Sequence, residues 1–100
     1  MCYDRRVKYF ESQIGSIAFS NERNRHIIAF HPDVGLHMQH FAETLSRPDF
    51  IRPSANDPSV AIYYRSLPRR RVYLAIVIKM GSKPFILTAY LAQKPKKHII

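Results

Sequence analysis

Several features that would place a protein in a common class are scarce in this sequence. Cys2 is the only cysteine, so the chain cannot form an internal disulfide, which is typical of cytosolic proteins. No apolar stretch approaches the ~20 residues that a membrane-spanning helix needs. The cationic N-terminal segment is not followed by the apolar core of a secretory signal. We therefore expect a cytoplasmic protein.

Several catalytic patterns are absent from the sequence as well. The three glycines do not form a phosphate-binding loop, and no nucleophile elbow occurs. The chain has only seven acidic residues, and no two of them form a pair of the kind that carboxylate-based enzymes use. The composition therefore disfavours two-metal nuclease chemistry, and we expect a function that needs no metal and no other cofactor.

Basic residues are abundant instead. Sixteen lysines and arginines oppose the seven acids over 100 residues, which gives a formal charge of +9 and a pI near 10.1. A charge of this size favours an anionic partner, such as a nucleic acid, an acidic protein or an anionic membrane. The hydrophobic content of 46% is that of a globular chain. We predict a single basic domain over residues 1–100.

The N-terminal segments have mixed strand and helix patterns. Residues 1–13 form either a first edge strand, at VKYFES, or a loose segment, and residues 13–19 alternate weakly and predict a short strand. Ser20 has the character of a helix N-cap. The pattern then predicts a helix over 21–30, which ends before Pro32 because the residue ahead of a proline avoids the helical conformation.

A second helix is predicted over residues 32–46. Pro32 suits its first position, where no backbone N–H is needed. Four apolar residues recur at helical spacing and predict a stripe that faces the core: Val34, Met38, Phe41 and Leu45. Residues 47–58 contain three prolines and predict a loop with at most a short extended piece at 50–52.

The last third of the chain has three strand-like runs, at residues 59–66, 69–80 and 83–94. Short links between them favour antiparallel pairing. Alternation predicts an aliphatic sheet face that carries the helices. The opposite face is predicted to hold the polar and aromatic residues of these strands: Tyr63, Arg65, Tyr73, Lys79, Thr88 and Tyr90. We expect the basic tail, residues 94–100, to fray.

The predicted polar face combines the groups that RNA contacts require. Cations pair with phosphates, and flat rings stack on unpaired bases. The link before the second strand adds cations that can grip phosphate without reading sequence: Arg69, Arg70 and Arg71. The alternative is an ordinary solvated sheet face and turn, where such residues are common. The net charge favours the nucleic-acid interpretation.

Two histidines near the first predicted helix are candidates for acid–base chemistry. His31 lies just ahead of the second helix, where the positive end of the helix dipole keeps an imidazole neutral and able to accept a proton. His26 lies within the first helix, on the same helix face as Phe30. Either histidine can instead be structural, His31 as a cap-like residue and His26 as a partly buried, hydrogen-bonded one.

A zinc site is an alternative use of the second helix. Asp33, His37 and His40 fall on one helical stripe, and these residue types can ligate zinc. No fourth ligand and no cysteine accompany them. We therefore favour a solvated helix face and predict no metal site.

The order of several motifs adds a resemblance to a known superfamily. The motifs are RHIIAFHPD (25–33), ETLSRPDFIRPS (43–54), AIYYRS (61–66), VYLAIVIK (72–79) and FILTAYLAQKPKK (85–97). Over about residues 14–97 the chain resembles the phage-associated nuclease-like domains of the barnase/EndoU/colicin/RelE-like superfamily. The resemblance implies an α+β fold in which one or two N-terminal helices pack on a four-stranded antiparallel sheet. It also implies a metal-independent ribonuclease or toxin, with matching positions at His26, His31, Arg65, Thr88 and Tyr90.

Three functions remain open from the sequence. The first is a metal-independent endoribonuclease, in which His26 or His31 activates a ribose 2′-hydroxyl and Arg65, with Lys79, stabilises the charge on the phosphate. The second is an RNA- or DNA-binding module without catalysis. The third is an interaction protein for an acidic partner, such as an antitoxin or immunity protein. An exposed N-terminal strand would also allow pairing with a second copy as a homodimer.

Overall fold

The computed structural model describes residues 7–68 and 72–93. Residues 1–6, the Arg69–Arg71 run and the predicted basic tail at 94–100 lie outside the described residues. In chain order the elements are strands β1 (Val7–Ser12) and β2 (Gly15–Ser20), helix α1 (Asn21–Phe30), the 3-10 helix η1 (Pro32–His40), helix α2 (Phe41–Ser46), and strands β3 (Phe50–Pro53), β4 (Val60–Ser66), β5 (Tyr73–Lys79) and β6 (Phe85–Ala92).

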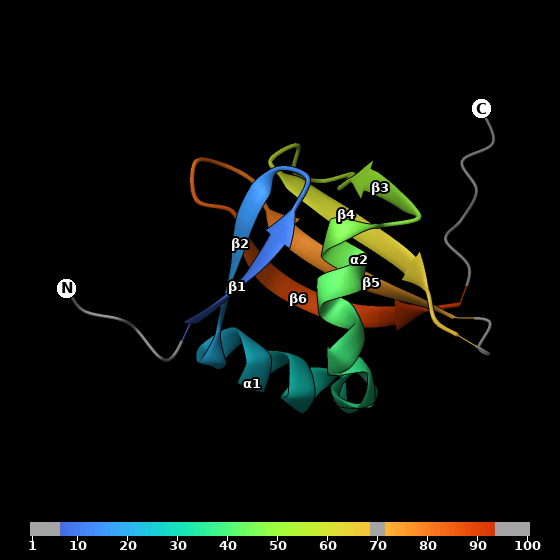
Figure 1. Ribbon diagram of the computed structural model, residues 1–100. Coiled ribbons are helices and arrows are strands. Elements are labelled where there is room, and N and C mark those ends of the chain that lie inside the picture. Colours follow the sequence, from blue (N-terminus) through green and yellow to red (C-terminus); the bar gives the residue numbers. More distant parts are fainter. Residues whose placement is uncertain (1–6, 69–71, 94–100) are drawn as a thin grey trace.

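The strands form one six-stranded sheet in the order β1-β2-β6-β5-β4-β3. The pairs β3–β4, β4–β5 and β5–β6 are antiparallel, as predicted for the three C-terminal strands. β2 pairs with β6 in parallel, at Ala18 and Phe85, so the sheet is mixed. The sheet curls into a half-barrel, which brings the β1–β2 hairpin to the side where α2 lies (Figure 1), and α2 contacts β1.

The prediction of N-terminal helices on a four-stranded antiparallel sheet was wrong. The helices follow a complete β-hairpin, because the weakly alternating N-terminal segment turns back on itself before α1 begins. Gly15 has a φ of +112°, and the Ser12 hydroxyl donates to the Gly15 carbonyl (2.8 Å) and accepts from the Ile14 N–H (3.2 Å). The hairpin then adds two strands to the edge of the sheet that β6 would otherwise form.

Helix α1 has the boundaries that its capping residues predict. The Ser20 side chain accepts a hydrogen bond from the Arg23 backbone N–H at 3.2 Å, which satisfies one free donor of the first turn. At the other end the His31 N–H bonds to the Ile27 carbonyl, and Pro32 begins the next element.

The predicted second helix is divided into η1 and α2. His37 has non-helical backbone angles (φ −121°, ψ 17°), and regular α-helix begins only at Phe41. The apolar stripe is nevertheless as predicted, since Val34, Phe41 and Leu45 are fully buried and Met38 packs against them. The stripe is preserved because side chains three or four residues apart stay on one side of either kind of helix.

All three helical elements pack on the same face of the sheet, which we call the helix-bearing face. Ile27, Val34 and Phe41, one from each helical element, belong to the core cluster together with strand residues. Phe19 stacks on Phe41 with ring centroids 5.5 Å apart. The buried members of the cluster are Ile17, Phe19, Ile27, Val34, Phe41, Leu45, Tyr63, Leu67, Leu74, Ile76, Ile78, Ile86 and Ala89. In the described part of the chain, no helix has the length and apolar character needed to cross a membrane.

Strand β4 is oriented opposite to the prediction. Tyr63 pairs with Ile76 and Arg65 with Leu74, and both partners are core residues, so Tyr63 and Arg65 lie on the helix-bearing face. The alternation was ambiguous because β4 has apolar residues on both of its sides. Tyr63 is only 1% exposed, and it is therefore a core residue instead of a surface ligand for nucleic acid.

A register irregularity in β6 sets the direction of its polar residues. The pairing with β5 shifts between Val77 and Ile78, so that Ile86 and Ala89 both face the core. Thr88 pairs with Val77 and Tyr90 with Ala75, which places both side chains on the face away from the helices. For Thr88 and Tyr90 the predicted face is confirmed.

Candidate nucleic-acid interface

The face opposite the helices carries most of the aromatic and hydroxyl side chains of the sheet. We call it the tyrosine face and define it by six residues from four strands. Their positions follow from the strand registers, since directly paired residues point to the same side. The six are Phe50, Arg52, Tyr64, Tyr73, Thr88 and Tyr90.

One row of this face runs across four strands and is almost entirely aromatic. Phe50 pairs with Tyr64, Tyr64 with Ala75, and Ala75 with Tyr90. The Phe50 and Tyr64 rings stack with centroids 4.7 Å apart and planes inclined by 20°. Because Ala75 has a small side chain, Tyr64 and Tyr90 approach each other above it and share a hydrogen bond between their side chains.

The environment of Tyr90 keeps its hydroxyl protonated. Burial raises the pKa of Tyr90 to about 12, and the hydrogen bond with Tyr64 adds to the rise. At neutral pH Tyr90 therefore acts as a neutral hydroxyl that can donate a hydrogen bond. It is a poor general base.

His31 reaches the end of this aromatic row round the edge of the sheet. β2 pairs with β6 only at Phe85, so the later part of β6 is met by α1 and η1, at whose junction His31 lies. The His31 and Tyr90 ring centroids are 6.3 Å apart, with the planes inclined by 44°. Of the predicted site residues, the chain thus brings His31 next to Tyr90, and Thr88 lies on the same face of β6 as Tyr90.

His26 has a different setting from His31. It is exposed on α1, and its ring packs on Phe30 with centroids 4.7 Å apart. Phe30 is itself 69% exposed. The pairing of these two residues on one helix face is as expected, and it directs the His26 ring along the helix surface.

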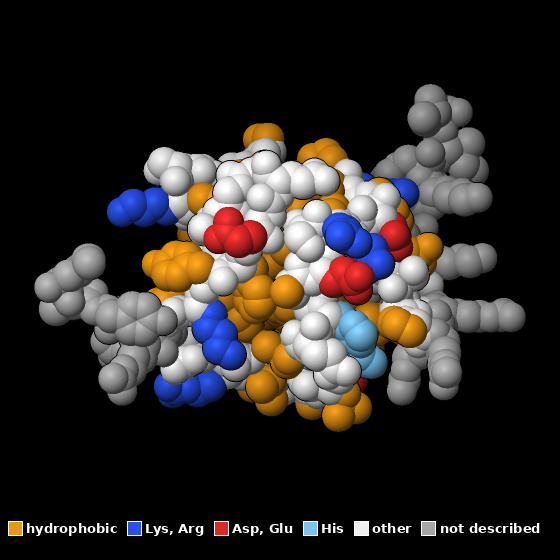
Figure 2. Space-filling view, viewed as in Figure 1, with side chains coloured by type: hydrophobic (Ala, Val, Ile, Leu, Met, Phe, Trp, Pro, Cys, Tyr) orange, Lys and Arg blue, Asp and Glu red, His pale blue; other side chains and the backbone are white. Residues whose placement is uncertain are grey.

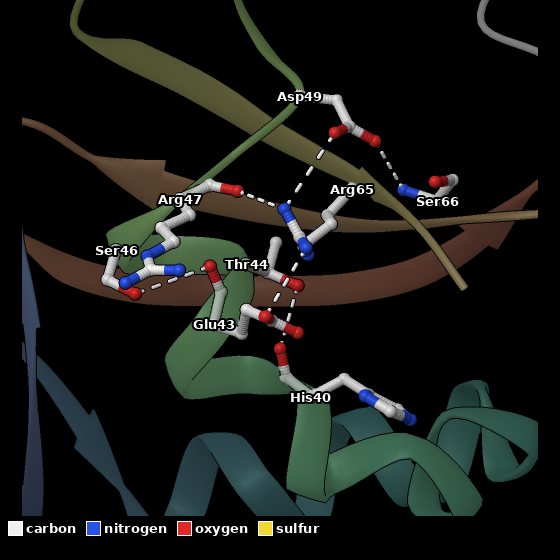
Figure 3. A network of polar contacts seen from close by, with 8 residues as sticks. All are labelled: His40, Glu43, Thr44, Ser46, Arg47, Asp49, Arg65 and Ser66. Carbon is white, nitrogen blue, oxygen red and sulfur yellow. Dashed lines mark hydrogen bonds and ion pairs between the residues drawn. The ribbon is translucent and has the colours of Figure 1, made fainter. Parts of the chain in front are cut away.

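Arg65 is held in a polar network on the helix-bearing face (Figure 3). One guanidinium nitrogen, Nη2, lies 3.3 Å from Oε2 of Glu43 in α2. The other, Nη1, donates to the Arg47 carbonyl at 2.7 Å and lies 3.8 Å from Oδ1 of Asp49. Asp49 in turn accepts a hydrogen bond from the Ser66 N–H at 2.7 Å. Arg65 therefore joins β4 to the link between α2 and β3.

Figure 2 shows the types of side chain that surround this network on the helix-bearing side. Basic and acidic side chains lie against one another over the region of α2, while hydrophobic side chains show between α2 and the hairpin (Figure 2). Since two carboxylates flank its guanidinium, Arg65 is partly neutralised. It is separated by the sheet from Thr88 and Tyr90, with which the sequence grouped it.

Lys79 lies on the same side of the sheet as the tyrosine face, at the end of β5 that is opposite to Tyr73. Its Nζ is 3.2 Å from Oδ2 of Asp57 and also donates to the Ser59 hydroxyl. Hydrogen bonds from Ser59, with a contribution from Lys79, lower the pKa of Asp57 to about 2. Lys79 is therefore an ion-paired residue that also closes the loop before β4.

The stripe considered for zinc does not gather into a ligand cluster. His37 is buried and its ring centroid is 6.0 Å from that of His40, whereas Asp33 is exposed. Among the residues that the structure describes, no three histidine, cysteine or acidic side chains come close enough together to hold a metal ion.

Sequence reasoning did not assign a role to Phe50, Arg52 or Tyr64. The Arg52 guanidinium carbon lies 5.2 Å from the centre of the Phe50 ring, and Phe50 also contacts Tyr73 at 5.6 Å. Residues 50–52 were expected to be extended, and alternation within FIRP would have placed Phe50 and Arg52 together on one side. Their pairing with β4 could not be read from that short segment.

No protein-family model, no curated protein and no solved structure matches this chain at a significant level. The residues of the tyrosine face, together with His31 at its edge, are therefore the features from which a function can be proposed.

Proposed function

We propose that this chain is a metal-independent endoribonuclease of the barnase/EndoU/colicin/RelE-like type, which binds single-stranded RNA on the tyrosine face and cleaves it beside His31. The observation that carries the proposal is the approach of the His31 ring to Tyr90, at the end of an aromatic row. A histidine next to hydroxyl donors supplies both a base and charge stabilisation, while the net charge of +9 attracts the polyanion.

In the proposed reaction, neutral His31 takes the proton from a ribose 2′-hydroxyl. The 2′ oxygen attacks the adjacent phosphorus, the bond from phosphorus to the 5′ oxygen breaks, and that oxygen takes up a proton. The products are a 2′,3′-cyclic phosphate and a free 5′-hydroxyl. The Thr88 hydroxyl donates a hydrogen bond to the phosphate oxygens on which negative charge builds. Tyr90, whose hydroxyl is hydrogen-bonded to Tyr64, orients the substrate beside His31.

The rest of the tyrosine face supplies RNA binding in this proposal. Half-buried Phe50 and Tyr73 offer ring surfaces to unpaired bases, and each stacked base contributes about 1–3 kcal/mol in proteins of this kind. Arg52 lies in the row of Thr88, three strand spacings away, which is about 14 Å. Arg52 is thus suited to a neighbouring phosphate and not to the one that is cleaved.

A non-cleaving RNA-binding module is the second candidate function. The observation that favours it is the position of Arg65, because the arginine expected to stabilise the reacting phosphate is paired with Glu43 and Asp49 on the other face. In this case the same rings and cations bind RNA, and His31 is one more contact residue.

A cleavage assay with an RNA oligonucleotide and its all-deoxy counterpart, both in the presence of a chelator, separates the two functions. We expect cleavage of the RNA alone, ending in a cyclic phosphate, because the attacking 2′-hydroxyl is missing from DNA. His31→Ala should lower the cleavage rate by about 100-fold or more while the dissociation constant for RNA changes little. His26→Ala should behave like the parent protein, since the His26 ring packs on Phe30.

The other outcomes also have definite meanings. Binding that weakens steeply with salt, without any cleavage, would replace the nuclease by the binding module. Equal cleavage by the parent protein and His31→Ala would remove His31 from the mechanism. Binding of neither RNA nor DNA would reject both functions in favour of an acidic protein partner, such as an antitoxin or immunity protein.

A further inference from the structure

A groove lies between the β1–β2 hairpin and the turn that joins β5 to β6. Its volume is about 350 Å³, within the range of small-ligand sites. The residues that line it come from both sides: Tyr9, Ser16, Ala18, Ser82, Lys83 and Pro84. None of these residues belongs to the tyrosine face as defined above.

The two walls of the groove are fixed relative to each other by the parallel pairing of β2 and β6. The Ala18 N–H donates to the Pro84 carbonyl at 3.0 Å, and Ala18 pairs with Phe85. The adjoining turns depend on Gly15 and Gly81, whose φ angles are +112° and +147°. The small Ala18 side chain leaves room between the walls.

The groove offers an aromatic surface next to a cation. Tyr9 is 65% exposed although it belongs to a strand, so its ring can stack on a planar group. Lys83 is exposed in the turn, beside the hydroxyl of Ser82. On the hairpin wall, the Ser16 hydroxyl donates to Oε2 of Glu11 at 2.7 Å, so a carboxylate also lies beside the groove. Lys83 is the cation that lines the groove, and its ammonium group can pair with an anionic group.

The groove opens on the same side of the sheet as the tyrosine face. Tyr9 pairs with Ala18, Ala18 with Phe85, and Phe85 with Lys79, and this row has the orientation of Thr88 and Tyr90. Tyr90 is five positions after Phe85 in β6, which corresponds to about 16 Å along the strand. One extended RNA strand of several nucleotides can thus contact His31 and the groove together.

We infer that this groove is a second subsite for single-stranded RNA, in which one base stacks on Tyr9 and an adjacent phosphate pairs with Lys83. The inference rests on the proposed function and adds to it the direction in which the bound strand runs, along β6 from Tyr90 to the β5–β6 turn. It also predicts that affinity depends on groups outside the tyrosine face.

The test measures the dissociation constants of fluorescently labelled ten-nucleotide RNAs that carry 2′-O-methyl groups and so cannot be cleaved. Tyr9→Ala should weaken binding about 5-fold or more, the lower end of what one stacked base contributes. Tyr9→Phe keeps the ring and should restore the affinity. Lys83→Ala should weaken binding and lower the slope of log affinity against log salt by about 1.

Lys8→Ala is the matched control for Lys83→Ala. Lys8 is exposed on β1, but it pairs with the core residue Phe19 and thus points to the helix-bearing side. Loss of affinity in Tyr9→Ala and Lys83→Ala but not in Lys8→Ala supports the subsite. An equal loss in both lysine variants would overturn it, because net charge would then explain the effect.

Two further outcomes separate the subsite from the proposed function. If the parent protein binds RNA and Tyr9→Ala binds it equally well, the subsite is wrong and the proposed function stands. If the parent protein binds no RNA, the proposed function fails and the subsite fails with it. Both substituted side chains are exposed, so the variants are expected to fold.

Discussion

The two faces of this sheet use similar residues for different purposes. On the helix-bearing face, Arg65 joins three chain segments through two carboxylates and a backbone carbonyl. On the tyrosine face, the guanidinium carbon of Arg52 lies 5.2 Å from the centre of the Phe50 ring. The two strand arginines therefore differ in the contacts that we can name, two carboxylates and a carbonyl for Arg65 and an aromatic ring for Arg52.

Tyr63 and Tyr64 extend the same contrast to neighbouring residues. Tyr63 points into the core and is 1% exposed, whereas Tyr64 forms the base of the aromatic row with Phe50 and Tyr90. Both side chains are buried, yet only Tyr64 contacts residues that a nucleic acid could reach. Burial alone therefore does not tell which face of the sheet an aromatic residue belongs to.

The largest expected difference between the two faces of the sheet is in the free energy of unfolding of their variants. Tyr63→Ala should lower the free energy of unfolding by about 3–5 kcal/mol, because it opens a cavity in the core. Tyr73→Ala, on the tyrosine face, should cost about 1 kcal/mol or less, because Tyr73 is half-buried. Urea denaturation measures both values. Similar losses for the two variants would show that the faces do not differ as described.

The two arginines give the second test of the comparison. Arg65→Ala should lower the free energy of unfolding by only about 1 kcal/mol, because the partly exposed ion pairs of Arg65 are screened by solvent. RNA affinity should be unchanged, because Arg65 lies on the helix-bearing face. Arg52→Ala should lower RNA affinity several-fold and make the affinity less dependent on salt, because Arg52 lies on the tyrosine face.

Denaturation and RNA titration on the same two protein preparations make this test direct. If Arg65→Ala abolished RNA binding or cleavage without loss of stability, the arginine would belong to the functional site after all. The assignment of the two faces would then have to be reversed for this residue.

The smallest expected effect is the loss of stability at high pH that follows from the raised pKa of Tyr90. The pKa of Tyr90 is raised to about 12 from its ordinary value of 10.0. A raised folded-state pKa means that the contribution of Tyr90 to stability is complete below about pH 10 and is lost as the pH rises towards 12. Burial raises the pKa of Tyr63 as well, so ultraviolet absorbance of tyrosinate should show more than one late-titrating tyrosine, and Tyr90→Phe should remove one of them. Titration of every tyrosine near the ordinary value would contradict the buried Tyr64–Tyr90 contact.

Much of the local structure could be predicted because neighbouring residues decide it. Ser20 caps α1, Pro32 ends it, and the apolar stripe through Phe41 identifies the segment that packs on the sheet. Alternation also predicted the strands β4, β5 and β6 and their antiparallel order. Thr88 and Tyr90 lie on the face of β6 that alternation predicted, and the His31 ring lies 6.3 Å from that of Tyr90.

The helix ends, the apolar stripe, the last three strands and the strong positive charge depend on residue type and on spacing along the chain, so they can be read without coordinates. The pairing of β2 with β6, the side on which Arg65 lies and the approach of His31 to Tyr90 become visible only in three dimensions, because each of these contacts joins segments far apart in sequence. β4 has apolar residues on both sides, so the packing of the helices decides which of its two sides is buried.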